Sequence, residues 1–262
     1  VVDDSGILPR SKTAAVHLGS EFKSIKDENG NNVHITKKTF SLTDEMVTWA
    51  QQENYTNWEL SLVCRFKWTY AQLHVAFIDT ERRYGYTVTP GAGDLSRTGG
   101  GVTGQIREKE QAWVENSLAG LDEPGEWAID VANGKIYLWA RDSGVPANII
   151  ASGDVVEMVL IEGDIDYDGP TDILVIGLTF DGLSFAHANR KVWDEDHLGW
   201  ERQHSWEIFD DASGMFRLRG ADHCQILNSR FYDSGATGIR LDLHAQYNEI
   251  EGNILENLGG AG

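Results

Sequence analysis

The amino-acid sequence predicts an all-β protein, with an antiparallel β domain followed by the first coils of a parallel β-helix. Two observations support this fold class. In residues 58–88 every second residue is apolar over several short runs, as in strands that place one face in a core. Residues 224–238 (CQILNSRFYDSGATG) and 248–262 (NEIEGNILENLGGAG) resemble each other at an offset of 24 residues. Short repeats of this kind are typical of stacked coils that bury their apolar faces against one another.

The antiparallel domain is predicted over residues 1–150. Residues 1–56 are polar, with a turn signal at Asn29-Gly30, and the first clear strand begins at Trp58. Residues 126–141 (EWAIDVANGKIYLWAR) predict a hairpin. Its Asn133-Gly134 dipeptide lies between two alternating runs, and this is the strongest short-range signal for a turn between antiparallel strands.

The second domain is predicted over residues 151–262, where the pattern changes. Residues 155–161 (VVEMVLI) and 173–180 (ILVIGLTF) are nearly continuous apolar runs. Such runs are typical of strands covered on both faces, as in parallel sheets. No helical stretch long enough for a crossover separates them, which disfavours a doubly wound α/β fold.

Within the repeat, four apolar residues are predicted to face a shared interior. At the offset of 24 residues, Ile226 aligns with Ile250 and Phe231 aligns with Leu255. Gly235 is predicted at a corner between strands, in a backbone conformation that only glycine adopts cheaply.

Composition excludes several classes of partner. The formal net charge is −19, so the chain should repel nucleic acid, whose affinity for proteins comes mainly from Lys and Arg contacts to phosphate. No apolar run reaches 18 residues, so no membrane span is expected. An apolar content of 41% allows a real core. The strong acidity fits a soluble exported protein or one from salty water, and simple solubility explains it equally well.

One segment resembles a known family. Residues 113–130 (WVENSLAGLDEPGEWAID) and 134–142 (GKIYLWARD) resemble a signature of the right-handed parallel β-helix carbohydrate-active proteins, which include fucosidase- and xylanase-type glycoside hydrolases. The matching positions are Trp113, Glu115, Asn116, Leu121, Asp122, Pro124, Gly125, Glu126, Trp127, Asp130, Tyr137 and Leu138. Residues 175–180, 185–188 and 238–262 share the likeness.

The resemblance implies a β domain ahead of a right-handed parallel β-helix. It implies a secreted, periplasmic or cell-surface protein that acts on polysaccharide or oligosaccharide. It also implies that the chain is an N-terminal fragment, because these proteins continue through many more coils and some catalytic acids are expected beyond Gly262.

The first candidate catalytic group is the row Arg240, Asp242 and His244. If Ile239 and Leu241 face the core, these three side chains share the outer face, about 6–7 Å apart along the strand. Glycoside hydrolysis needs two carboxyl groups, so Asp242 is the candidate acid or base, with His244 and Arg240 orienting the substrate. The alternative is a solvated charged face.

Four further residues are weaker candidates, each with a plain alternative. Asp233 is a second candidate catalytic acid, or a turn residue before a glycine-rich corner. Trp206 and Glu207 combine an aromatic ring with a carboxylate, as a sugar-binding cleft does, or form part of a surface loop. His187 either borders the substrate or is only hydrogen-bonded.

A calcium site is the one metal site that the sequence suggests. Asp164, Asp166 and Asp168 precede Gly169 with the D-x-D-x-D-G spacing of a calcium-binding loop. The twelfth position is Val175 rather than the bidentate Glu of that motif. The default interpretation is an acidic turn between strands, with no cofactor.

The sequence therefore favours a polysaccharide-degrading glycoside hydrolase. Two alternatives stay open. One is a polysaccharide lyase on the same scaffold, which would abstract a proton beside a uronate. The other is a non-catalytic glycan-binding protein of the tailspike type.

Overall fold

The computed structural model describes residues 1–4, 6–16, 29–30, 39–63, 70–88, 111–142, 144, 146–168, 170–190 and 214–260. These residues belong to two compact units. The antiparallel unit contains residues 8–147, and the coil unit contains residues 1–7, 148–190 and 214–260. The coil unit thus begins at Asn148, close to the predicted boundary after residue 150, and it also includes the N-terminal segment.

The antiparallel unit is built around a five-stranded sheet with the order β3–β6–β5–β4–β7. Its strands are β3 (Thr39–Ser41), β4 (Glu59–Val63), β5 (Tyr70–Asp79), β6 (Tyr84–Thr87) and β7 (Gln111–Glu115). All neighbouring strands run antiparallel. The predicted hairpin is confirmed: β8 (Trp127–Asp130) pairs with β9 (Lys135–Leu138), and Gly134 takes a left-handed φ of 60° in the turn.

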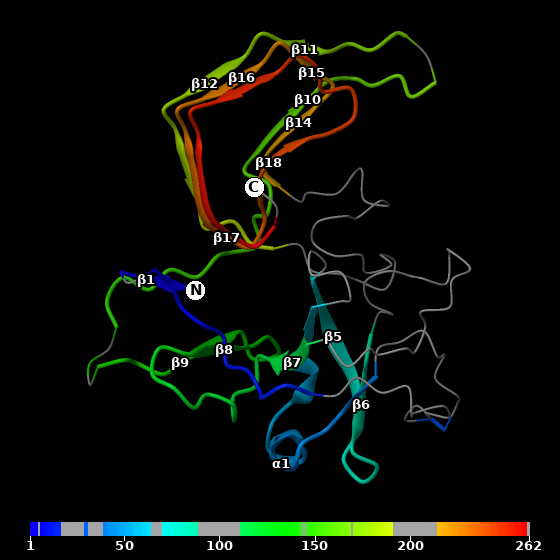
Figure 1. The fold of residues 1–262 in the computed structure, drawn as a ribbon, viewed down its shortest axis with the longest axis vertical. Coiled ribbons are helices and arrows are strands. Elements are labelled where there is room, and N and C mark those ends of the chain that lie inside the picture. The colour runs from blue at the N-terminus through cyan, green and yellow to red at the C-terminus, as the bar shows by residue number, and fades with distance from the viewer. Residues whose placement is uncertain are drawn as a thin grey trace. The chain divides into compact units, whose positions relative to one another are not determined.

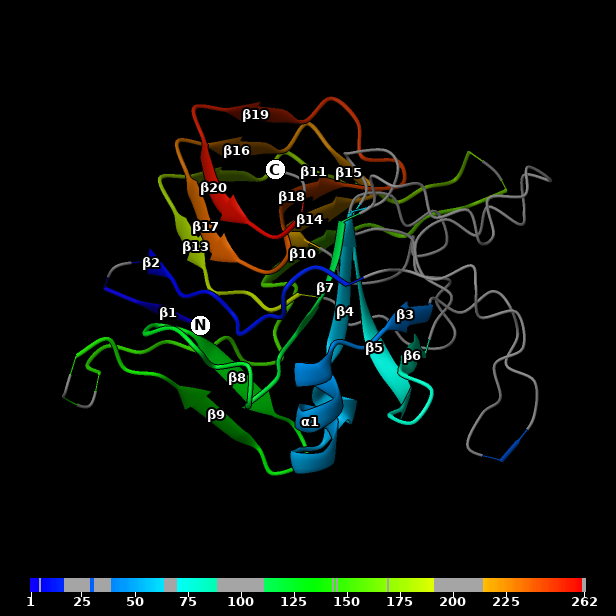
Figure 2. The ribbon, with the colours of Figure 1, turned by 60° about the horizontal axis from the view of Figure 1, so that its bottom comes forward.

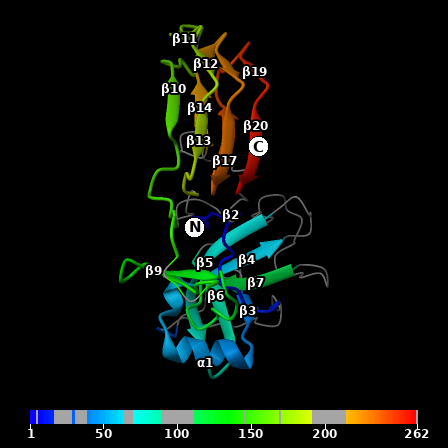
Figure 3. The same ribbon diagram turned by 90° about the vertical axis from the view of Figure 1, so that its left-hand side faces the viewer.

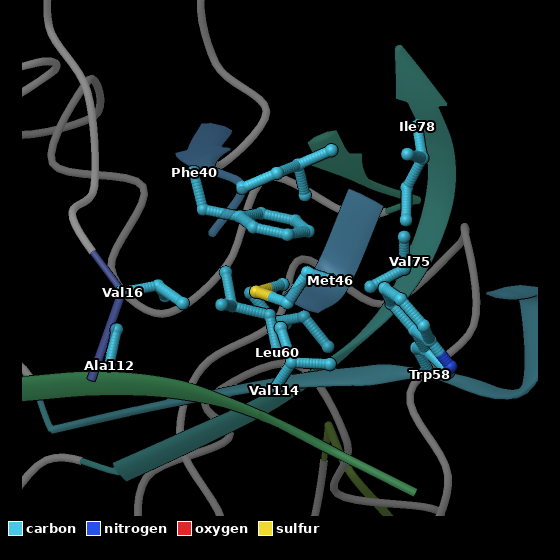
Figure 4. Packing of buried hydrophobic residues seen from close by; sticks show 11 residues of the cluster. Val16, Phe40, Met46, Trp58, Leu60, Val75, Ile78, Ala112 and Val114 are labelled. Atoms are coloured by element: carbon cyan, nitrogen blue, oxygen red, sulfur yellow. The ribbon is translucent and has the colours of Figure 1, made fainter. Parts of the chain in front are cut away.

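A short helix contributes to the core of this unit, and the sequence analysis did not predict it. Helix α1 (Asp44–Gln52) starts at Thr43, whose hydroxyl accepts a hydrogen bond from the Met46 amide; a single-turn 3-10 helix, η1 (Tyr55–Asn57), follows. Met46 is fully buried beside Phe40, Trp58 and Leu60 (Figure 4). Leu60 of β4 thus faces the core, as the alternation predicts.

The coil unit consists of parallel strands from three successive passes of the chain. The first pass supplies β10 (Val159–Glu162), β11 (Val175–Ile176), β12 (Thr179–Asp181) and β13 (Ser184–Ala186). The second supplies β14 (Gly214–Arg219), β15 (Ala221–Asp222), β16 (Gln225–Leu227) and β17 (Arg230–Ser234). The third supplies β18 (Thr237–Leu241), β19 (Glu249–Glu251) and β20 (Ile254–Leu258). A two-stranded antiparallel pair, β1 (Val2–Asp3) with β2 (Gly6–Ile7), also belongs to this unit.

Equivalent strands of the three passes lie side by side. The parallel sheets have the orders β10–β14–β18, β11–β15, β12–β16–β19 and β13–β17–β20 (Figures 2 and 3). In the view of Figure 1, the backbone traces of the three passes follow one another closely around the same path. The predicted register is confirmed: Ile226 pairs with Ile250 and Phe231 pairs with Leu255.

The interior of the stack is apolar. Phe231 is fully buried and stacks on Phe185, with ring centroids 5.0 Å apart. Phe216 meets both rings edge-on. These aromatic contacts join the first and second passes into one core.

One expectation about the first pass is wrong. Residues 155–161 and 173–180 do form parallel strands, but these strands are not covered on both faces. Leu160 is 40% exposed and Ile176 is 64% exposed. In a coil only the inward side chains reach the core, so the outward apolar residues of these runs stay at the surface of the described residues.

The corners between strands are stacked as well, and three of them repeat a left-handed residue. One corner aligns Gly182, Asn228 and Gly252, with φ of 70°, 46° and 70°. Glycine and Asn adopt this conformation most readily. Gly235 has no left-handed φ, contrary to expectation; a Cβ there would lie 2.7 Å from the Arg190 amide, so space rather than conformation requires glycine.

Candidate active site

The predicted outward row holds for Arg240 and Asp242 but does not extend to His244. Ile239 belongs to the buried core of the coil unit, and Arg240 lies on the opposite side of β18. The strand ends at Leu241, and His244 lies in a turn with a left-handed φ of 56°. The alternation therefore stops before His244 is reached.

Asp242 is a buried carboxylate held by arginine. Arg217 from β14 contacts Asp242 Oδ2 through Nε at 3.0 Å and Nη2 at 2.9 Å. The Nη2 of Arg240 lies 3.4 Å from the same oxygen, and the Leu243 amide donates to Oδ1 at 2.9 Å. The side chains of Arg217 and Asp242 are only 3% and 5% exposed. Asp242 is thus fixed in position rather than part of a solvated face.

A second carboxylate meets the same guanidinium. Glu157, just before β10, lies with Oε2 3.4 Å from Arg217 Nη1. Because one guanidinium contacts both acids, the carboxylates of Glu157 and Asp242 lie within about 9 Å of each other, and glycosidase pairs use separations of roughly 5–9.5 Å. Glu157 was missed in the sequence, because it comes from the first pass, which shows no visible repeat.

Burial perturbs one member of this charge network. Desolvation lowers the pKa of Arg240, and the neighbouring Arg217 acts in the same direction, whereas Asp242 opposes them. The network of Glu157, Arg217, Arg240 and Asp242 pairs two carboxylates with two guanidinium groups. Opposite charges placed this way offset the large cost of burying each of them alone.

His244 has a different partner. Its Nδ1 contacts Oδ2 of Asp172, in the segment between β10 and β11. Asp172 also accepts a hydrogen bond from the Asp166 amide at 2.7 Å. The bond with His244, followed by the Asp166 amide, holds the pKa of Asp172 below its usual value. His244 therefore anchors an acidic loop.

This contact predicts a pH dependence of stability. Because folding lowers the pKa of Asp172, its contribution is present above the unfolded pKa and disappears as the pH falls through the folded value. Asp172→Asn should lower the Tm at pH 7, and the difference from the parent should vanish toward pH 2. Asp168→Asn, in the same loop, should leave the Tm unchanged. Thermal melts across this range check the result; a Tm difference for Asp172→Asn that is independent of pH would contradict it.

Asp166, one of the predicted calcium ligands, is hydrogen-bonded within the acidic loop. Asp166 accepts hydrogen bonds from the Asp168 amide and the Thr171 hydroxyl, and Asp164 forms an antiparallel bridge with Ile173. Within the described part of the chain, no three His, Cys, Asp or Glu side chains are grouped so that they could hold a metal ion. The calcium site stays a prediction.

Asp233 and His187 occupy the same corner of successive passes. His187, Asp233 and Asn257 have left-handed φ of 64°, 49° and 52°. The carboxylate of Asp233 accepts a hydrogen bond from the Asn257 amide group at 2.9 Å, and the ring of His187 packs edge-on against Tyr232. Both residues have a structural explanation at this corner. Trp206 and Glu207 lie outside the described residues.

A second group of buried ionisable residues lies in the antiparallel unit, and no sequence pattern revealed it. Glu59 and Glu115 face each other directly on β4 and β7. Arg10 Nη1 lies 2.5 Å from Glu59 and 3.5 Å from Glu115. Glu115 also accepts a hydrogen bond from Gln72 at 2.8 Å. The guanidinium thus joins the segment around Arg10, within the antiparallel unit, to two acids that would otherwise repel each other.

The segment that carries the family resemblance serves a structural purpose here. Asn116, with a left-handed φ of 68°, donates to the carbonyls of Asn57 and Ile129 and accepts from the Ile129 amide. Glu126 accepts hydrogen bonds from the amides of Asp122 and Glu123. Asn116 thus joins the strand-flanking backbone at Asn57 to the hairpin at Ile129, and Glu126 fixes the turn that precedes β8.

Comparisons with known proteins give little further identification. No family model and no curated protein matches the sequence. Among solved structures, the chain is similar to a protein described as "Glycoside hydrolase", with a TM-score of 0.49 and 10% sequence identity. The alignment covers 98% of this chain and 53% of that protein, so the chain spans about half of its length. No helix among the described residues is long and apolar enough to cross a membrane.

Proposed function

We propose that this chain belongs to an exported glycoside hydrolase that degrades polysaccharide, and that its coil unit is the start of a right-handed parallel β-helix. The observation that supports the proposal most is the buried pair Glu157 and Asp242 on a shared guanidinium. The resemblance of residues 113–142 to β-helix carbohydrate-active proteins points in the same direction.

Energetics favours a functional interpretation of the pair. Replacing a buried ion network by apolar residues is often neutral or stabilising, so stability alone does not explain why charges are kept here. Ionisable groups perturbed by burial and by each other are concentrated at functional sites. The apolar interior of the coils lies on the other side of the same strands and supplies a rigid support.

The proposed roles follow from the contacts. Asp242, which lies 2.9–3.0 Å from Arg217, acts as the nucleophile, or as the base that activates water. Glu157, whose contact with Arg217 is longer at 3.4 Å, is the proton donor to the leaving glycosidic oxygen. Arg217 sets the separation of the two carboxyl groups. This separation determines whether hydrolysis retains or inverts the configuration at the anomeric carbon of the sugar.

The proposal is tested on a panel of neutral and anionic polysaccharides. We expect new reducing ends from at least one neutral polysaccharide, without any rise in ultraviolet absorbance. Unsaturated products that absorb in the ultraviolet would show a lyase instead. Binding of a glycan without any cleavage would show a non-catalytic binding protein.

A further inference from the structure

A pair of stacked aromatic rings lies at the corner of the coils where β15 leads into β16. Figure 1 shows the course of the backbone at this corner. His223 and Tyr247 occupy equivalent places on successive passes, because their preceding residues, Asp222 and Gln246, pair in parallel. Their ring centroids are 5.3 Å apart, with 28° between the planes. Tyr247 is 76% exposed. Two aromatic side chains are thus displayed together at the surface of the coil unit.

The backbone at these two positions favours glycine, not an aromatic residue. His223 and Tyr247 have left-handed φ of 51° and 52°. The first pass has Gly177 at the equivalent place, with φ of 76° and nothing within 4 Å of a Cβ built there. The neighbouring corner uses only Gly and Asn. Histidine is tolerated in this conformation, as at His187 and His244, but a tyrosine is strained. The ring of Tyr247 is therefore kept for a reason other than the turn.

Polar groups suited to hydroxyls continue from the rings. Oδ1 of Asp222 lies 2.8 Å from Nδ1 of His223. Two residues beyond the corner, Gln225 pairs in register with Glu249, and its amide donates to that carboxylate at 2.6 Å. We name Asp222, His223, Gln225, Tyr247 and Glu249 the corner strip.

The chemistry of the corner strip identifies the class of ligand. The electron-rich face of a tyrosine ring attracts weakly positive C–H groups, and the face of a pyranose ring presents several. Carboxylates and amides accept and donate hydrogen bonds to hydroxyl groups. The two carboxylates of the strip, in a chain of net charge −19, repel a polyanion.

We propose that the corner strip is a binding subsite for a neutral oligosaccharide, with one sugar ring stacked on Tyr247. His223 supports the ring of Tyr247, Asp222 holds His223, and the exposed Glu249 receives the sugar hydroxyls. The choice of a sugar as ligand rests on the proposed function, whereas the exposed ring pair does not depend on it.

The test uses Tyr247→Gly, which copies the corner of the first pass. Isothermal titration calorimetry with neutral oligosaccharides, such as xylo-, manno- and cello-oligosaccharides, should show binding to the parent chain. Tyr247→Gly should weaken the Kd at least tenfold, while its Tm stays within about 2 °C of the parent. Tyr137→Ala, an exposed tyrosine of the other unit, is the matched control and should bind normally.

Three outcomes would overturn the proposal. They are an absence of binding by the parent chain, an unchanged affinity in Tyr247→Gly, and a larger fall in Tm that makes the ring a structural element. The result is separable from the proposed function. If the parent chain binds through Tyr247 but hydrolyses nothing, the subsite stands and the hydrolase is refuted. If the chain hydrolyses polysaccharide and Tyr247→Gly binds normally, the hydrolase stands and the subsite is refuted.

Discussion

Asp242→Asn is expected to lower the turnover of the cleaved polysaccharide by roughly 10²- to 10⁴-fold, the usual contribution of a general acid or base. The amide keeps the shape of the side chain and an oxygen for Arg217, so the coils should still form. The loss should appear in kcat rather than in KM, because the carboxylate acts on the transition state.

The matched control for this change is Glu251→Gln, which removes an exposed carboxylate from β19 of the same stack. Its kcat should stay within about twofold of the parent. Circular dichroism of both variants confirms that they are folded. Normal turnover by folded Asp242→Asn would mean that the buried network of Glu157, Arg217 and Asp242 is purely structural.

Arg10→Met is expected to lower the free energy of unfolding by about 3–5 kcal/mol, the usual cost of removing one member of a buried ion pair. The side chains of Glu59 and Glu115 are 4% and 11% exposed, and the same guanidinium nitrogen contacts both. Without it, two carboxylates face each other across neighbouring strands, an arrangement that destabilises a sheet.

Urea unfolding measures this effect. Lys12→Met is the control, because Lys12 is exposed two residues along the same segment and such surface changes usually stay within about 0.5 kcal/mol. If Arg10→Met changed the unfolding free energy no more than Lys12→Met does, the ion pair would contribute nothing to the stability of the antiparallel unit.

The register between the second and third passes could be predicted from the sequence, whereas for the first pass only its strands could be predicted and not their register. Equivalent residues of the second and third passes are 24 residues apart, as in the hydrogen bond between Gln225 and Glu249. The apolar residues of these two passes therefore align in the sequence. The first pass lies 57 residues before the second at β10, where Val159 pairs with Phe216, and 46 residues before it at β12, where Thr179 pairs with Gln225. Insertions at two places hide such a repeat, so the contribution of Glu157 to the candidate site was not visible.

The other misses have local causes. Helix α1 has only nine residues, too few for a clear 3.6-residue period beside strong strand signals. His244 was placed on the outer face because alternation was extended past Leu241, where the strand ends. Glu59 and Glu115 are distant in sequence and meet only through the register of β4 with β7.

The stacking of successive passes is the claim on which the candidate site and the sugar subsite both depend. Ile226 and Ile250 are register partners in β16 and β19, and parallel neighbours lie about 4.8 Å apart. In a sample with labelled isoleucine methyl groups, we predict a strong nuclear Overhauser cross-peak between these two residues. Assignment by Ile250→Val, followed by the absence of any such cross-peak in the folded parent chain, would contradict the account.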